Sequence, residues 1–272
     1  MNLEDYFISQ FRSVNIGDDG AFVDGYVYSK DAFFENVHFK TDWMNYYQIA
    51  SKAMLVNISD AISMNAKPLY ALLAVAMPKS ITKSQMSELV RGFEDVAKKY
   101  SIEIIGGDTI SNTKLDITVT IISKTKKPLF RKGVKHNDLF AFTGELGQSK
   151  KELTKLFRGG SINKKSKFVD IKLRDAFVFK TARYLRTGMD ISDGLFSDLA
   201  KMTATNKIGA QLYRCISKKI ACSGEEYEML VSFDKRYRKT MLRRSECSRT
   251  KLTIFAKAKR VKYTSRCKAN HF

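Results

Sequence analysis

YALLAVAM, residues 70–77, is an unbroken apolar run that stops at Pro78, and it predicts a strand that is buried on both faces. Further along the chain, LDITVTIIS at residues 115–123 alternates apolar and polar positions. This alternation predicts a second strand, in which Leu115, Ile117, Val119 and Ile121 share one buried face. Together the two strands indicate a sheet with a substantial core.

An amphipathic helix is expected between these strands. Apolar residues recur at three- and four-residue steps from Met86 to Tyr100, and Thr82 and Gln85 have the spacing of a capping box. A short strand at Glu103–Ile105 follows the helix. The order strand, helix, strand, strand predicts an α/β layered unit in which helices cover a sheet.

The segment Lys124–Pro128, KTKKP, interrupts this pattern with charge and a proline. We therefore expect a boundary between an amino-terminal domain, residues 1–127, and a carboxy-terminal domain, residues 128–272. The second domain resumes with an expected strand at Leu139–Thr143, a glycine loop and a helix, so it is α/β as well. A chain of 272 residues is long enough for two domains of ordinary size.

The composition is typical of a globular protein: 44% of the residues are hydrophobic, 28% are charged, and only three are prolines. The longest apolar run, Leu69–Pro78, is too short to cross a bilayer, and Glu4 and Asp5 do not suit a signal peptide. We expect a cytoplasmic protein with no membrane partner. The cysteines show no C-x-x-C spacing and are expected to be reduced thiols: Cys215, Cys222, Cys247 and Cys267.

Charge is divided unevenly along the chain, whose net charge is +20. Residues 1–130 contain 14 Lys/Arg and 15 Asp/Glu, whereas residues 131–272 contain 34 and 13. This asymmetry favours an anionic partner for the second half, whether a nucleotide, a phosphorylated metabolite, a nucleic acid or a membrane surface. A solvated basic surface without a specific partner is the alternative, because charge reports on association and solubility rather than on fold.

Aspartates occur in tight groups beside Gly or Ser, where the chain is expected to turn. Mg²⁺ takes oxygen ligands and meets phosphates through a few carboxylates, so the groups predict a metal–nucleotide site. Each aspartate taken alone is better explained as a turn or capping residue, but five separate groups favour the metal site. The groups contain Asp18 with Asp19, Asp31, Asp60, Asp108, and Asp190 with Asp193.

Other catalytic sites lack their motifs. The sequence contains no G-x-x-x-x-G-K-[ST] loop, no G-x-G-x-x-G after a strand and no H-E-x-x-H. A Ser/His/Asp triad has little material, because the only histidines are His38, His136 and His271.

Eight segments form an ordered series: IGDDGA (16–21), YSKD (28–31), NVHF (36–39), NISDAISMNAKP (57–68), IGGDT (105–109), RKGVKHNDLFAFTGELGQS (131–149), MDISDGLFSDL (189–199) and SGEEYEM (223–229). Taken together they resemble the thiamine-phosphate kinases, a family of the aminoimidazole ribonucleotide synthetase-like superfamily of ATP-using enzymes. NISD and DISDGL are fairly specific to this family, whereas GGDT is shared more widely in the superfamily. The resemblance covers nearly the whole chain.

The resemblance implies an enzyme that transfers the γ-phosphoryl group of ATP to thiamine phosphate and makes thiamine diphosphate. It also implies an amino-terminal α/β domain that pairs with its copy in a homodimer, a carboxy-terminal α/β domain, and an active site in the cleft between them. The cofactor would be Mg²⁺, in several copies. No catalytic base is needed, because the acceptor phosphate is already ionised at neutral pH.

The resemblance also implies roles for individual residues. The Mg²⁺ ligands would be Asp18, Asp31, Asp60, Asp108, Asp190 and Asp193, with Ser29 and Lys30 at positions that contact metal in relatives. The nucleotide contacts would be Gly107, Asp108, Arg131 and Ser192. Thiamine phosphate would be held by His38, Glu225 and the position of Ala269.

Two of the departures from the family pattern fall on expected site residues. Lys30 stands where relatives commonly carry a hydroxyl residue, which would place a cation beside metal ligands. Ala269 stands where relatives usually carry an aromatic residue that stacks on the substrate. The alternatives are another ATP-using synthetase of the same superfamily, an inactive relative, or a basic nucleic-acid-binding protein. The last is disfavoured, because five acidic groups would repel phosphate in the absence of metal.

Overall fold

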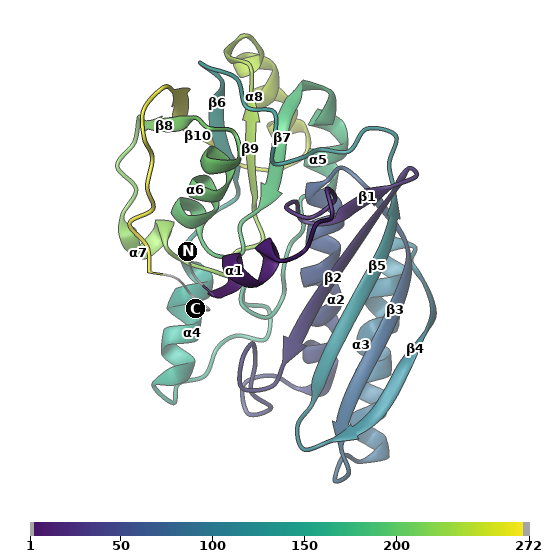
Figure 1. The fold of residues 1–272 in the computed structure, drawn as a ribbon. Coiled ribbons are helices and arrows are strands. Elements are labelled where there is room, and N and C mark those ends of the chain that lie inside the picture. Colours follow the sequence, from purple (N-terminus) through teal and green to yellow (C-terminus); the bar gives the residue numbers. More distant parts are fainter. Residues whose placement is uncertain (1–2, 269–272) are drawn as a thin grey trace.

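Two five-stranded sheets form the framework of the chain, whose computed structural model describes residues 3–268 (Figure 1). The first sheet has the strand order β1-β2-β5-β3-β4, and its neighbouring strands are antiparallel except for the pair β3 and β4. Its strands are β1 (Ala21–Val23), β2 (Tyr26–Phe34), β3 (Lys67–Pro78), β4 (Glu103–Asn112) and β5 (Asp116–Lys124).

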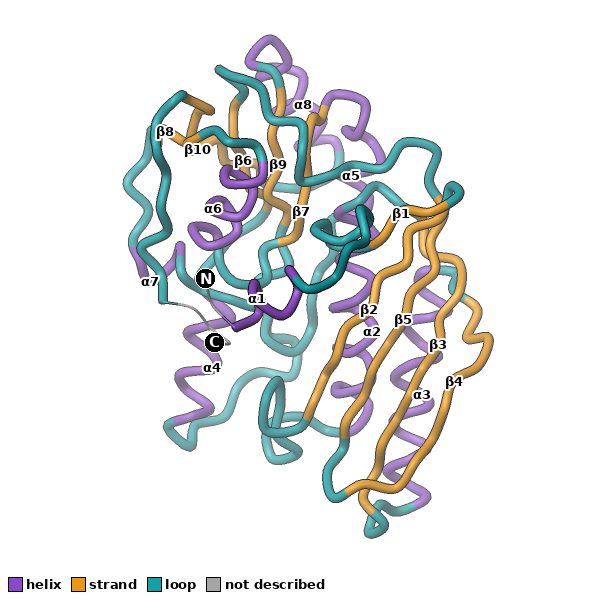
Figure 2. Tube along the Cα trace, in the orientation of Figure 1, coloured by secondary structure: helices purple, strands orange, loops and turns teal. Residues whose placement is uncertain are grey.

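Two helices, α2 (Tyr46–Ser63) and α3 (Lys83–Tyr100), lie on the same face of this sheet (Figures 1 and 2). Helix α3 is the crossover that a parallel pair such as β3 and β4 requires. It begins with the expected capping box, in which the Gln85 N–H donates to Thr82 Oγ1 and the Thr82 N–H donates to Gln85 Oε1. The sequence-based prediction of this helix is confirmed.

The two predicted strands both form, but one of them is not buried as expected. In β5, Ile117, Val119 and Ile121 are at most 1% exposed, as the alternation predicts. In β3, by contrast, Tyr70 is 38% and Leu72 is 37% exposed, so burial on both faces is wrong for this chain. Both helices lie behind the sheet in Figure 1 and its front face is open. An apolar run indicates a strand, but it does not show that the same chain covers both faces.

The second sheet has the strand order β7-β9-β6-β10-β8, and every neighbouring pair is antiparallel. Its strands are β6 (Leu139–Thr143), β7 (Leu185–Asp190), β8 (Gly209–Leu212), β9 (Met229–Phe233) and β10 (Leu252–Lys259). The helices outside the first sheet are α1 (Leu3–Ser9), α4 (Gln148–Phe157), α5 (Asp175–Thr181), α6 (Leu195–Thr205), α7 (Lys218–Ala221) and α8 (Arg238–Cys247).

Helices cover both faces of the second sheet. Along β9, Leu230 packs in the apolar cluster that contains Leu199 of α6, whereas Val231 packs in the cluster that contains Met241 of α8. Every residue of β6 and β9 is therefore buried. Short strands buried on both faces read as unbroken apolar runs, which is why the sequence predicts β6 at Leu139–Thr143 correctly.

Helix α2 is buried against both sheets. It packs on β2 and β5 of the first sheet and also contacts β7 of the second. Apolar residues surround it, and one continuous core includes Ile58 of α2, Ile117 of β5 and Val231 of β9. Thirteen of its 18 residues are buried, including Lys52 and Asn57, as expected for a helix that lies between two layers. The predicted two-domain α/β fold class is confirmed; the predicted boundary at residue 127 falls between the last strand of one sheet and the first strand of the other.

Two further expectations concern the cysteines and the membrane. The prediction of four reduced thiols is wrong for Cys222 and Cys267, which form a disulfide with a Cα–Cα distance of 5.5 Å, whereas Cys215 and Cys247 are free. The segment after β10 packs beside α7, so the two cysteines meet although 45 positions separate them in the sequence. Cysteine spacing alone cannot predict this contact. Among residues 3–268, no helix combines the length and hydrophobicity needed to cross a bilayer.

Candidate metal and nucleotide site

The last two turns of α2 bring together acidic side chains from distant parts of the chain. The carboxyl group of Asp60 lies beside that of Asp31 on β2. Ser59 Oγ donates to Asp190 Oδ2 at the end of β7 (2.9 Å), and Ser63 Oγ donates to Asp19. Residues 59 and 60 precede residue 63 by four and three positions, so both neighbour it on the same side of the helix. We refer to Asp19, Asp31, Asp60, Asp190 and Asp198 as the aspartate cluster.

Protein donors surround Asp19 on both of its oxygens. Arg131 donates from Nε to Oδ1 at 2.9 Å and also pairs with that oxygen through Nη2. The Asp190 N–H donates to Oδ2 at 3.2 Å, beside the Ser63 hydroxyl. Because all of its acceptor positions are directed to the protein, Asp19 anchors the 17–20 loop to the second domain.

Asp198 joins the cluster from the first turn of α6. Its Oδ2 accepts hydrogen bonds from the backbone N–H groups of Asp193 (3.2 Å) and Gly194 (3.1 Å). Its other oxygen faces Lys201 at 3.7 Å. Asp198 is fully buried, and Asp190 is only 3% exposed. The cluster therefore concentrates carboxylates in a region with little access to water.

Burial and mutual repulsion make the cluster reluctant to ionise. Burial, followed by the charge of Asp19, raises the pKa of Asp31 to about 6. Burial raises the pKa of Asp198 to about 7. The pKa values of Asp60 and Asp190 are also well above the usual range, because burial and then neighbouring carboxylates disfavour their charged forms. The nearby cations Arg131 and Lys201 thus do not offset the effect of burial on these carboxyl groups.

A hard divalent cation fits this donor set. No three Asp, Glu, His or Cys side chains within residues 3–268 are arranged to hold a metal ion as they stand. Mg²⁺ does not require such a cage, because it keeps several waters and binds one or two carboxylates together with substrate phosphates. Burial raises the pKa values of these carboxyl groups, and a bound cation would favour their ionised form. They therefore suit an ion that binds together with a polyphosphate.

Asp18 and Arg131, two of the expected site residues, lie beside the cluster. Asp18 Oδ1 accepts a hydrogen bond from the Arg131 backbone N–H at 2.6 Å. Burial raises the pKa of Asp18 above its usual value. The guanidinium of Arg131 is engaged by Asp19, so in this structure it anchors the loop rather than pointing to open solvent.

Ser29 and Lys30 point to opposite faces of β2. Ser29 is buried beside α2, where its hydroxyl donates to Asn57 Oδ1 at 2.6 Å. The Lys30 ammonium lies on the other face and donates to the hydroxyls of Thr118 (3.2 Å) and Thr120 (3.4 Å). The cation that was expected beside the metal ligands is therefore separated from Asp31 by the sheet.

Gly107 and Asp108 do not meet the aspartate cluster within one chain. They lie on β4, the edge strand of the first sheet, three strands from β2. At about 4.8 Å per strand, the separation from β2 is roughly 14 Å. Gly107 has a φ of +156°, and a Cβ there would lie 1.6 Å from the Leu73 carbonyl oxygen, so the close approach of β3 requires glycine.

Ser192 and Asp193 occupy the loop between β7 and α6. Asp193 pairs with Lys201, and the Ser192 carbonyl accepts a hydrogen bond from the Glu225 N–H at 2.7 Å. The loop turns at Gly194, whose φ is +108°. The structure thus brings the DISDGL and SGEEYEM segments into direct contact.

The residues expected to hold the acceptor lie farther along α2 from the cluster. His38 stacks on Phe33 with ring centroids 5.5 Å apart, and its Nδ1 accepts a hydrogen bond from the Phe34 N–H. Glu225 pairs with Lys52 of α2 at 2.8 Å. Ala269 lies outside the described residues.

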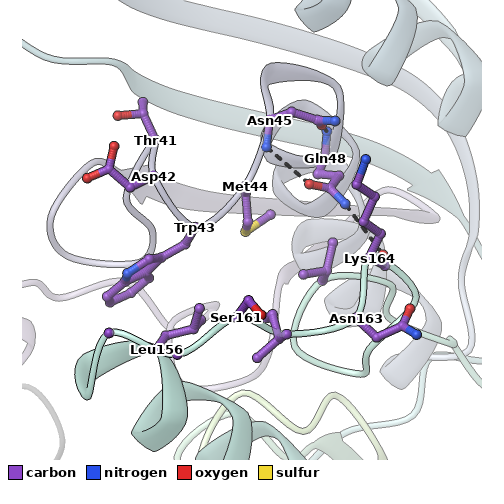
Figure 3. A pocket seen from close by; sticks show the side chains of 14 residues that line it. Thr41, Asp42, Trp43, Met44, Asn45, Gln48, Leu156, Ser161, Asn163 and Lys164 are labelled. Carbon is purple, nitrogen blue, oxygen red and sulfur yellow. Dashed lines mark hydrogen bonds between the residues drawn. The ribbon is translucent and has the colours of Figure 1, made fainter.

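A cavity of about 620 Å³ opens at the start of α2 (Figure 3). Trp43 and Gln48 line it on one side and the segment around Ser161 on the other. The Gln48 side chain bridges the Asn45 N–H and the Lys164 carbonyl, so it joins the two walls. Gln48 precedes Asp60 by twelve residues, or about 18 Å of helix, which separates this cavity from the aspartate cluster.

Sequence reasoning missed three residues of the site. It grouped Asp19 with Asp18 but named only Asp18 as a ligand, and it did not select Asp198 or Lys52. Asp198 follows Asp193 by five positions in MDISDGLFSDL, a signal that was available. Lys52 carried no signal, because a single lysine in an apolar helix pattern looks like an exposed position.

Comparisons with known proteins identify relatives of this chain. Residues 17–125 match the family model described as AIR synthase related protein, N-terminal domain. The chain is 31% identical over 221 residues to the thiamine-monophosphate kinase of Bacillus subtilis (strain 168), covering 73% of this chain and 66% of the relative. It is 30% identical over 213 residues to that of Rhodopirellula baltica, covering 74% and 64%. The chain thus spans slightly less than two thirds of the length of these relatives.

A solved structure described as AaThiL complexed with AMPPCP and TMP superposes with a TM-score of 0.86 at 22% identity, covering 96% of this chain and 91% of that one. The family match over residues 17–125, together with the two-domain α/β fold, thus assigns the chain to the AIR synthase-like superfamily. Within that superfamily, the chain belongs to the thiamine-monophosphate kinase family.

Proposed function

We propose that this chain transfers the γ-phosphoryl group of ATP to thiamine phosphate, with Mg²⁺ as cofactor, and makes thiamine diphosphate and ADP. The observation that carries the proposal is the aspartate cluster at the junction of the two domains, in a chain whose relatives are thiamine-monophosphate kinases. The relation of the chain to AaThiL, described with AMPPCP and TMP, supports ATP and thiamine phosphate as the two substrates. The cytoplasmic location follows from this biosynthetic role and is part of the proposal.

The chemistry requires charge compensation more than proton transfer. A phosphate monoester has a second pKa of about 6, so the acceptor oxygen is ionised at neutral pH and needs no base. The chemistry that Mg²⁺ would supply here, when bound, is compensation of the negative charge on the phosphoryl oxygens. Asp31, Asp60 and Asp190 are proposed to hold the ion, with Asp18 on the adjoining loop.

The remaining residues position these carboxylates. The Arg131–Asp19 pair fixes the loop that presents Asp18, and Ser59 fixes the rotamer of Asp190. Groups held in this way lose little entropy when the substrates arrive, which favours the in-line geometry that phosphoryl transfer needs. Ser192 and Gly107 stay as proposed nucleotide contacts; His38, Glu225 and Ala269 stay as proposed contacts of thiamine phosphate.

A homodimer would account for the open face of the first sheet. Tyr28, Tyr70, Leu72, Ile105 and Ile110 are each at least 37% exposed in strands of this sheet. The register of β2, β5, β3 and β4 aligns Asp108 with Ala32, which places Asp108 on this face together with Lys30. A second copy packed on this face would bury the apolar residues and is the way in which Asp108 could contribute to a shared site.

The test is product formation by the purified chain. Incubation with ATP, Mg²⁺ and thiamine phosphate should yield thiamine diphosphate, and Asp190→Asn should abolish it while the circular dichroism spectrum is unchanged. Asp95→Asn, at an exposed position of α3, is the matched control and should retain activity. Thiamine diphosphate formation that persists in Asp190→Asn would remove the cluster from the mechanism, and no formation by the wild type would refute the proposed function.

A further inference from the structure

Lys52 is the unusual feature of α2. Its side chain is fully buried, although lysine is among the residues most often exposed. The ammonium lies 2.8 Å from Glu225 Oε2 and 3.7 Å from the ring centroid of Phe168, with the ring of Phe33 at 5.7 Å. An ammonium buried in this way must be stabilised by its partners, and the carboxylate and the aromatic faces are those partners.

One carboxylate oxygen of Glu225, Oε1, accepts no hydrogen bond from the described part of the chain. Glu225 has a side chain that is 25% exposed, and the other oxygen, Oε2, binds Lys52. Its backbone is fixed by the Ser192 carbonyl (2.7 Å) and by the Ser149 hydroxyl (2.7 Å), in the left-handed region with φ of 54°. Holding a non-glycine residue in this conformation costs free energy, so the surrounding contacts must fix the position of this carboxylate.

Lys52 also occupies an intermediate position along α2. It follows Gln48, which lines the cavity of Figure 3, by four residues, and it precedes Asp60 by eight, or about 12 Å. An acceptor molecule whose phosphate reaches the aspartate cluster would extend along this side of the helix toward Glu225. A hydrogen-bond donor on that molecule would meet Glu225 Oε1.

We infer that Lys52 is a positioning residue for the acceptor substrate: it holds one oxygen of Glu225 and thereby presents the other to an amino or hydroxyl group of the acceptor. This inference rests on the proposed function, because it assigns Glu225 to the acceptor side of the site. It adds a residue that contacts neither substrate. It also makes the domain junction part of substrate selection, since Lys52 and Glu225 belong to different domains.

The kinetic signature distinguishes positioning from a purely structural role. Lys52→Met retains the apolar stem and removes the charge, and it should raise KM for thiamine phosphate by about tenfold to a hundredfold, the effect of one charge-assisted hydrogen bond. The kcat and the KM for ATP should change by less than about threefold, because the aspartate cluster is untouched. Lys52→Arg, whose guanidinium can pair with Glu225 and stack on Phe168, should restore part of the affinity.

Two controls complete the experiment. Arg186→Met removes a partly buried cation that pairs with Asp138 and Asp234, away from the acceptor residues, and it should lower the melting temperature without changing either KM. Lys52→Met combined with Glu225→Gln should bind thiamine phosphate no more weakly than the weaker single variant, because both substitutions remove one interaction.

The outcomes separate this inference from the proposed function. A wild-type KM in Lys52→Met, or an equal rise of both KM values together with a lower melting temperature, would overturn the role of Lys52 while the kinase stands. If Lys52→Met does not fold, Lys52→Arg and Glu225→Gln give the same comparison, and unchanged KM in both overturns it. A wild-type chain that neither turns over nor binds thiamine phosphate overturns the proposed function, and the inference with it.

Discussion

Replacing Asp31 by asparagine should stabilise the metal-free protein and inactivate the enzyme. Asparagine has the shape of aspartate but carries no charge, so it removes one carboxylate from the aspartate cluster without leaving a cavity. Burial and the charge of Asp19 raise the pKa of Asp31 to about 6, from an ordinary value of 3.8. Ionised Asp31 therefore opposes folding when no metal is bound.

The size of this effect follows from linkage. A folded-state pKa above the unfolded value means that the folded protein holds the proton more tightly, so stability is lost as the pH rises from about 4 to about 6. A difference of roughly two pKa units corresponds to about 3 kcal/mol once the pH exceeds 6. Asp31→Asn should recover up to that amount at about pH 7.5 and almost nothing at about pH 3.5.

Thermal unfolding measured with and without Mg²⁺ is the assay. Without metal at about pH 7.5, the melting temperature of Asp31→Asn should exceed that of the wild type by several degrees, at roughly 2–4 °C per kcal/mol. Mg²⁺ at about ten times its Kd should stabilise the wild type by about 1.4 kcal/mol and the variant by much less. Thiamine diphosphate formation should fall at least about a hundredfold in the variant.

Glu94→Gln is the matched control, because it removes one negative charge from an exposed position of α3. It should change neither the melting temperature nor the response to Mg²⁺. A lower melting temperature of metal-free Asp31→Asn at neutral pH, together with an undiminished Mg²⁺ response, would refute the electrostatic account of the cluster.

Three other predictions concern stability and assembly. Glu228→Gln should destabilise the chain by about 3 kcal/mol in urea unfolding, because it leaves Arg174 without its buried partner and Lys167 with Glu226 alone. Lys251→Gln, which removes an exposed cation, should have little effect. Burial alone would raise the pKa of Glu228, but hydrogen bonds and charge from Arg174 and Lys167 outweigh it and lower this pKa. The stabilisation by Glu228 should therefore be present near neutral pH and be lost as the pH falls below the usual glutamate range. A stability difference between wild type and variant that does not depend on pH would contradict this prediction. Thiol titration of the oxidised, denatured chain should find two reactive cysteines and, after reduction, four. Reduction should lower the free energy of unfolding by up to about 4 kcal/mol, because the disulfide links residues 45 positions apart. Four reactive thiols before reduction would disprove the pairing. Leu72→Glu should convert a dimer into a monomer in analytical ultracentrifugation, whereas Val90→Glu on the solvent side of α3 should not, and a dimer that survives Leu72→Glu would place the interface elsewhere.

Local patterns in the sequence were sufficient for much of the fold. The alternation at 115–123 predicts the buried face of β5, and the spacing around Thr82 and Gln85 predicts the start of α3, because both depend on neighbours a few residues away. The strand at Glu103–Ile105 was expected to be short, yet β4 continues to Asn112. Two glycines reduce strand propensity, and only pairing with β3 shows that the strand continues through them.

The site was predictable only where a motif marked it. Asp31, Asp60 and Asp190 were selected from sequence, and the structure brings them together. Asp108 was selected in the same way, but the sheet places it three strands away. Lys52 could not be found, because its significance arises from Glu225 and Phe168, which lie more than a hundred residues downstream. Such long-range charge pairing depends on how the two domains pack.

The most direct test of the central claim is a crystal structure of the chain with Mn²⁺ in place of Mg²⁺ and a non-hydrolysable ATP analogue. Anomalous scattering should place metal ions within about 2.5 Å of carboxylate oxygens of Asp31, Asp60 or Asp190, and in contact with the phosphates. Nucleotide phosphates bound away from these aspartates, with no metal beside them, would contradict the account.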